Sequence, residues 1–164
     1  MFNFILLSLH SVRATQTDLA ALIVEPNLSV ALIDSLFNAR EAIPRQFSIF
    51  LLTRLENRKF FEQPVYVNNN IRLAPVEWPV PSTTHAYSTL MLQCNIWRSL
   101  NAKFVFVFQN DSRFCSSSPY TIERFMKMNY SYIGAPWTTK YGPDPETVAF
   151  SMVGNGGFFL RRGG

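Results

Sequence analysis

The stretch Phe-Val-Phe-Val-Phe-Gln-Asn-Asp-Ser, residues 104–112, is the most informative part of the chain for the fold. Its first five residues are all aromatic or β-branched, a composition that favours a strand buried on both faces. The four residues that follow are polar, which indicates that the strand ends at Phe108. The sequence therefore predicts a central strand with an acidic turn directly after it.

Strand-like and helix-like segments alternate on either side of this strand. Short apolar runs predict buried strands, and apolar residues three and four positions apart predict amphipathic helices. The predicted strands are 20–24, 47–52, 71–76, 104–108, 130–133 and 158–160. Two helical segments are predicted at 28–37 and 54–61, and a third helix is capped at 82–84 and has Tyr87, Leu90, Met91, Cys94 and Trp97 on its inner face. A fourth helix is capped by Ser118 and has Pro119 at its first position. Such alternation indicates an α/β fold with a mostly parallel, Rossmann-like sheet and helices on both faces.

Size and composition fit one folded domain. The chain has 164 residues, of which 48% are hydrophobic and 16% charged, so neither disorder nor a coiled coil is expected. The net charge of +4 comes from scattered basic residues rather than a basic stripe, so we expect no nucleic-acid partner. No apolar stretch is long enough for an uninterrupted transmembrane helix.

The two ends of the chain raise separate questions. Residues 1–18 contain the apolar run 4–9 but lack a basic start and a small-x-small cleavage site, so a signal or anchor remnant and an ordinary N-terminal segment both stay open. Residues 19–164 form the expected single domain, and the chain ends at Gly164 just after a strand, so we expect this domain to be incomplete. The compartment, cytoplasm or the lumen of the secretory pathway, stays open.

Ligands of parallel α/β sheets bind beyond the carboxyl ends of the strands, where Glu25 and residues 109–112 are expected. Asp111 is the candidate ligand of a divalent cation that neutralises a diphosphate. Gln109, Asn110 and Ser112 add neutral hydrogen-bonding groups. The alternative is that Asn-Asp-Ser is only an Asx turn that ends the strand.

A glycine-rich segment, Gly154-Asn155-Gly156-Gly157, is the second candidate. Glycines allow a backbone to approach a ligand closely and to expose amide donors, and the alternative is a tight turn. Trp137 can stack on a sugar or a base, or act as a structural lid. The segment does not match a dinucleotide fingerprint, which argues against a nicotinamide-dependent oxidoreductase.

Four segments together resemble a family of uncharacterised glycosyltransferase-like proteins. They are Ala-Leu-Ile-Val-Glu-Pro (21–26), Phe-Gln-Asn-Asp-Ser (108–112) with Cys115, Tyr-Ile-Gly-Ala-Pro-Trp (132–137) and Val-Gly-Asn-Gly-Gly-Phe-Phe-Leu-Arg (153–161). The resemblance implies a GT-A-type fold and a nucleotide-sugar donor. It places Asp111 where such enzymes carry an Asp-x-Asp metal motif, with Gln109 in place of the first acid, and it implies Mn²⁺ or Mg²⁺ as the cofactor. The family also carries a later Glu-Asp motif, which does not occur before Gly164.

Two functions follow from these observations. The first is transfer of a sugar from a nucleotide-sugar donor to an unknown acceptor. The second is a non-catalytic module, derived from a transferase fold, that binds a nucleotide or a glycan. In both, the expected donor-binding residues are Glu25, Gln109, Asn110, Asp111, Ser112, Trp137, Gly154, Asn155, Gly156 and Gly157, with Asp111 as the metal ligand.

Overall fold

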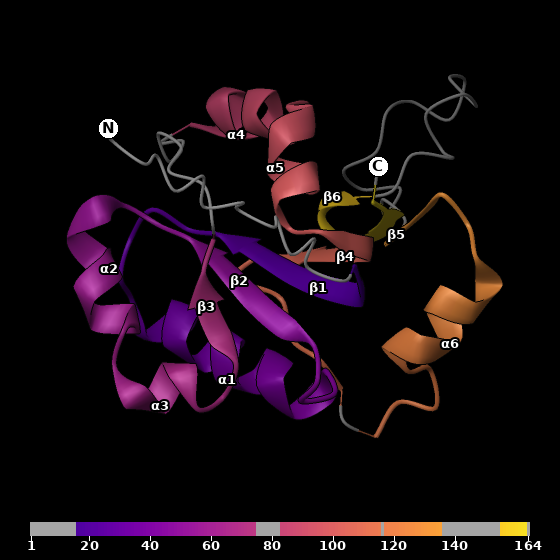
Figure 1. Cartoon of the computed structure of the whole chain (residues 1–164), viewed down its shortest axis with the longest axis horizontal. Coiled ribbons are helices and arrows are strands. Elements are labelled where there is room, and N and C mark those ends of the chain that lie inside the picture. The colour runs from indigo at the N-terminus through magenta and orange to yellow at the C-terminus, as the bar shows by residue number, and fades with distance from the viewer. Residues whose placement is uncertain (1–15, 75–82, 116, 136–154, 164) are drawn as a thin grey trace, which may run out of the picture.

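The computed structural model describes residues 16–74, 83–115, 117–135 and 155–163 (Figure 1). Trp137 and Gly154 lie outside these residues. The strands are β1 (Thr17–Val24), β2 (Ser48–Leu52), β3 (Ile71–Leu73), β4 (Ala102–Phe108), β5 (Tyr132–Ala135) and β6 (Asn155–Arg162). The helices are α1 (Val30–Ala42), α2 (Leu55–Phe61), α3 (Pro64–Val67), α4 (Thr84–Met91), α5 (Cys94–Ser99) and α6 (Ile122–Met128).

The described strands form one six-stranded sheet in the order β3-β2-β1-β4-β6-β5. β3, β2, β1 and β4 run parallel to one another, whereas β6 pairs antiparallel with both β4 and β5. The mostly parallel α/β fold predicted from the sequence is thereby confirmed. The chain moves from β1 outward to β2 and β3, then returns to β4 on the other side of β1. The order therefore reverses between β1 and β4, which makes the crevice between them a topological switch point.

Both faces of the sheet are covered by helices. Figure 1 shows α1, α2, α3 and α6 on one side of the sheet and α4 and α5 on the other. Alternate residues of β1 divide accordingly: Leu19, Ala21 and Ile23 pack in the core cluster under α1, while Ala20 and Leu22 pack in the cluster with α5. All five are almost fully buried, so the central strand is apolar on both faces as a doubly covered sheet requires.

One prediction about the helices is wrong. The single helix expected from residue 84 to 97 is two helices, because the chain breaks at Leu92–Gln93 between α4 and α5. The indole Nε1 of Trp97 donates to the main-chain oxygen of Met91 at 3.0 Å. In a continuous helix this oxygen would instead accept from the main-chain amide four residues later. Cys94, expected in the core, is exposed at the start of α5.

The start of α6 also differs from the prediction. The helix begins at Ile122, and the hydroxyl of Thr121, not that of Ser118, caps it by accepting from the Arg124 amide at 3.4 Å. Ser118 instead accepts from the Tyr120 amide within the preceding turn. The predicted inner face, which includes Ile122, does pack against the sheet.

A buried arginine holds the end of α1. Arg40 is 5% exposed, and its guanidinium donates to the main-chain oxygens of Ile43, Pro44, Phe47 and Asn69. Burial lowers the pKa of Arg40, and the nearby Arg45 lowers it further. The acceptors come from the loop after α1 and from the loop before β3, so this one side chain joins two connections at the amino end of the sheet.

Candidate functional site

The predicted polar residues meet at the carboxyl edge of the sheet. Glu25 directly follows β1, Thr53 follows β2, and the segment 109–112 follows β4. Because β1 and β4 are parallel neighbours, with Ile23 opposite Phe108, the loops that leave them diverge from the same end of the switch-point crevice. This edge is the candidate site.

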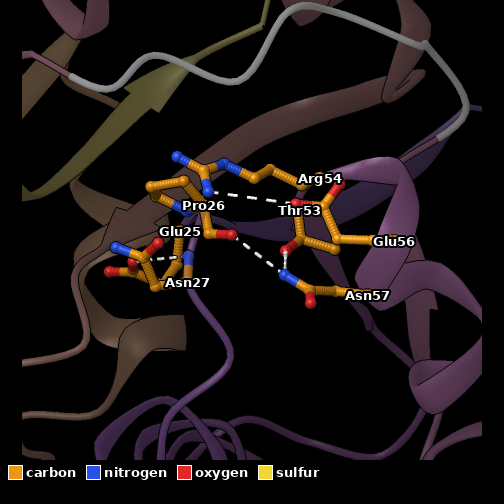
Figure 2. A network of polar contacts seen from close by, with 7 residues as sticks. All are labelled: Glu25, Pro26, Asn27, Thr53, Arg54, Glu56 and Asn57. Atoms are coloured by element: carbon orange, nitrogen blue, oxygen red, sulfur yellow. Dashed lines mark hydrogen bonds and ion pairs between the residues drawn. The ribbon is translucent and has the colours of Figure 1, made fainter.

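The carboxylate of Glu25 connects the two loops. Its Oε2 accepts a hydrogen bond from Nδ2 of Asn110 at 2.7 Å, and its Oε1 accepts one from the main-chain amide of Asn27 at 3.0 Å (Figure 2 shows the second contact). Both bonds have an ionised acceptor, which makes them stronger than bonds between neutral groups. Two residues predicted independently, Glu25 and Asn110, are therefore in direct contact although 85 positions separate them.

A third loop joins this arrangement through Asn57. The Asn57 side chain donates to the main-chain oxygen of Pro26 at 2.9 Å and to the hydroxyl of Thr53 at 3.1 Å (Figure 2). Pro26 follows β1, Thr53 follows β2, and Asn57 lies in α2. The ends of β1 and β2 are thus held together by one amide, which limits how far Glu25 can move.

The acidic turn has a defined shape. The Ser112 amide donates to the Gln109 oxygen at 3.0 Å, and the Gln109 amide donates to the Ser112 hydroxyl at 3.2 Å. These two bonds close the turn, as expected if the segment is a structural turn that ends β4. Asp111 lies at the tip of this turn. Asp111 is exposed, and its carboxylate makes no hydrogen bond or ion pair with any residue that the structure describes. A structural turn and a free carboxylate therefore occur together.

Two polar residues of α1 anchor the turn from below. The Ser35 hydroxyl donates to the Asn110 oxygen at 2.6 Å, and the Asn38 side chain pairs with both the amide and the oxygen of Phe114, at 2.7 and 3.4 Å. Ser35 and Asn38 are three residues apart and so lie on one face of the helix. Neither residue was predicted as part of the site; their polar character beside the leucine stripe of α1 was the available signal.

On the opposite face, Tyr87 of α4 lies beside Gln109. Burial raises the pKa of Tyr87 to about 12, and the Gln109 contact opposes part of that rise. The hydroxyl nevertheless lacks a hydrogen bond of acceptable geometry among the residues described. A hydroxyl this well buried supports the turn by packing, and it is not available to a ligand.

Two arginines flank the carboxylates and were also missed. Arg113 donates from Nη1 to the Ser35 hydroxyl and to the Ser112 oxygen, at 2.6 and 2.9 Å. Arg54 directly precedes α2 and makes a 3.9 Å ion pair with Glu56 between two exposed side chains, a weak interaction in water. The edge therefore brings the Asp111 carboxylate, which pairs with no described residue, together with two guanidinium groups, and guanidinium groups bind phosphate oxygens well.

The described carboxylates of the edge offer a metal ion few protein ligands. No group of three or more His, Cys, Asp or Glu side chains that could hold a metal occurs within the described ranges. Glu25 already accepts two hydrogen bonds, whereas Asp111 makes no hydrogen bond or ion pair with a described residue. This set fits Mg²⁺ or Mn²⁺ bound through one carboxylate with the remaining ligands from a diphosphate and water, and it does not fit a cage of protein ligands.

Part of the glycine-rich segment reaches the same edge. β6 starts at Asn155, and its pairing places Phe158 opposite Phe108 of β4. Since the two strands are antiparallel, residues 155–157 extend beyond Phe108, on the side where the acidic turn begins. The tight turn considered for Gly156 and Gly157 is wrong, because both belong to the strand. Gly157 is buried there.

No described helix is both long and apolar enough to cross a bilayer.

No curated protein and no solved structure matches the chain. A family described as proteins of unknown function, DUF5672, matches residues 70–164, which are 95 of the 164 residues and include the acidic turn and the glycine-rich segment but not Glu25. Because this match covers more than half of its length, the chain belongs to the DUF5672 family.

Proposed function

We propose that the carboxyl edge between β1 and β4 binds a nucleotide-sugar donor and that the protein transfers the sugar to an acceptor. One observation carries the proposal: the Asn110–Glu25 hydrogen bond of 2.7 Å joins the two loops at the switch point, where ligands of doubly wound sheets bind. The unpaired carboxylate of Asp111 adjoins that bond. The motifs that resemble glycosyltransferase-like proteins supply the donor class.

Each residue of the edge has a role in this proposal. Asp111 holds the divalent cation, and Arg113 and Arg54 face the negative charge of the diphosphate. Glu25 does not touch the reacting atoms; it positions Asn110, and through Asn110 the acidic turn. Asn155 and Gly157 belong to the strand whose first residues extend toward this edge, where a main chain without bulky side chains permits close approach of a ligand.

The reaction is a substitution at the anomeric carbon of the donor. The acceptor oxygen forms a new bond to that carbon, the carbon–oxygen bond to the diphosphate breaks, and the electron pair leaves with the nucleoside diphosphate. The acceptor's proton passes to a base that we do not assign. A bound Mg²⁺ or Mn²⁺ supplies charge neutralisation at the diphosphate, and the arginines add to it.

A second candidate is a non-catalytic module that binds a nucleotide or glycan. It is favoured because Asp111 can bind a metal–diphosphate complex, while Glu25 already accepts two hydrogen bonds, so the described residues of the edge leave no second uncommitted acid to act as base. The two candidates share the ligand and differ in turnover.

Thermal unfolding with a panel of nucleotide sugars, each with and without Mn²⁺, tests donor binding. A donor at about 100 times its Kd stabilises the folded chain by about 2.7 kcal/mol, which raises Tm by roughly 5–10 °C. Asp111→Asn should abolish the Mn²⁺-dependent part, while Asp18→Asn, the same charge change at the exposed amino end of β1, should preserve it. If no donor raises Tm, the donor proposal is wrong; stabilisation without release of nucleoside diphosphate selects the binding module.

A further inference from the structure

A cavity lies on the α1 side of the sheet. It has a volume of about 610 Å³, within the range of small-molecule sites. Its floor comes from β4 and β6, one wall from α6 and the loop before it, and one end from the last turn of α1. Figure 1 shows α1 and α6 on the same side of the sheet, with β4, β5 and β6 above the space between them.

The walls of this cavity are strongly apolar. Three of its phenylalanines form a contact cluster, in which the Phe106 ring lies 5.4 Å from that of Phe114 and 4.9 Å from that of Phe158. Phe125 and Ile122 of α6 complete the apolar lining. A polyhydroxylated glycan needs convergent polar groups, so this cavity suits an aliphatic or aromatic body instead.

Charge is restricted to the two ends. Glu41 lines the end at α1, and Arg113 lines the end at the acidic turn. Among the described residues, Arg113 donates hydrogen bonds from Nη1 to neutral oxygens, namely the Ser35 hydroxyl and the main-chain oxygens of Asn110 and Ser112. No described carboxylate pairs with it. The Arg113 end therefore favours a negative group, and Glu41 disfavours one at the other end.

We infer that this cavity binds a small amphipathic anion, with its apolar body against the phenylalanines and its anionic head at Arg113. The cavity shares Arg113 with the proposed donor site, but the inference rests on the apolar lining and can hold whether or not a donor binds. Arg113 also contacts the Asn110 oxygen, so the anionic head would lie next to the loop that carries Asp111.

Calorimetric titration with dodecanoate below its micelle concentration tests the inference, with dodecanol as the uncharged ligand of equal chain length. We expect one saturable site and weaker binding of dodecanol by about tenfold, as expected for loss of a charge-assisted hydrogen bond. Arg113→Gln should remove this preference, whereas Arg98→Gln, on the opposite face of the sheet, should keep it.

A filling variant locates the site. Ile122→Trp places a larger side chain in the cavity and should weaken dodecanoate binding by about tenfold or more, since an apolar ligand cannot share the space. Met128→Trp, an exposed position of the same helix that does not line the cavity, should leave binding within about twofold. Absence of binding, equal binding to Ile122→Trp and wild type, or unchanged preference in Arg113→Gln would each overturn the inference; circular dichroism confirms that every variant is folded.

Discussion

The contact between Glu25 and Asn110 gives a quantitative test of the candidate site. Removing either side chain breaks a charge-assisted hydrogen bond of 2.7 Å between two half-buried groups. Such bonds contribute about 1.5–3 kcal/mol, and the partial exposure of both residues lowers the expected value to about 1–2 kcal/mol. Asn110→Ala should reduce the free energy of unfolding by that amount. Glu25→Ala should cost more, because it also removes the acceptor of the Asn27 amide.

A double-mutant cycle measured by urea unfolding isolates the pair. The double variant should be more stable than the sum of the single effects predicts, by about 1 kcal/mol or more, since the same bond is lost only once. Asn27→Ala is the matched control: its contact with Glu25 uses the main-chain amide, so its side chain should show no coupling to Asn110. Coupling below about 0.3 kcal/mol between Glu25 and Asn110 would refute the claim that this bond joins the two loops.

Three further predictions concern groups that support the site or the sheet. Arg40→Lys should lower stability by about 2–4 kcal/mol in urea unfolding, because an ammonium group cannot reach the four main-chain oxygens that the guanidinium joins; an unchanged midpoint would contradict this. Tyr87→Phe should be neutral or stabilising near pH 7, since the lost hydroxyl has no well-formed hydrogen bond among the described residues. Burial raises the Tyr87 pKa from 10.0 to about 12, so the folded state keeps a proton that the unfolded state loses; about 2–3 kcal/mol of stability should disappear between pH 10 and 12 in the wild type and not in this variant. Gly163→Ala should lower Tm, because a Cβ there would lie 2.0 Å from the main-chain oxygen of Ala102; an unaltered Tm would show that β6 can shift away from β4.

The strand pattern could be predicted because it depends on local composition. Residues 104–108 are apolar on both faces, and only a central strand of a doubly covered sheet buries both. The alternation of strands and helices then placed the acidic turn at the carboxyl edge. The break between α4 and α5 was missed because its stabilising contact, from the Trp97 indole to the Met91 oxygen, forms only in the folded chain.

The acidic residues of the candidate site could be predicted from the sequence, but the residues that support them could not. Glu25 and Asp111 stand out because they are acidic residues that follow apolar strands, at the sheet edge where ligands of parallel α/β sheets bind. Ser35, Asn38 and Arg113 do not, since polar residues on a helix or in a loop are common on surfaces. Their roles depend on a contact between α1 and the loop after β4, and no local pattern specifies which helix packs under which loop.

The central claim is that a nucleotide-sugar donor binds between the ends of β1 and β4. Amide chemical-shift mapping tests it directly, with the isotope-labelled chain titrated with UDP-glucose, UDP-N-acetylglucosamine and GDP-mannose in the presence of Mg²⁺. We predict the largest shifts at the amides of Glu25, Asn27 and residues 109–113, and none at the amino edge around residues 45–48 and 101–103. Shifts confined to the amino edge, or no shifts with any of the three donors, would contradict the claim.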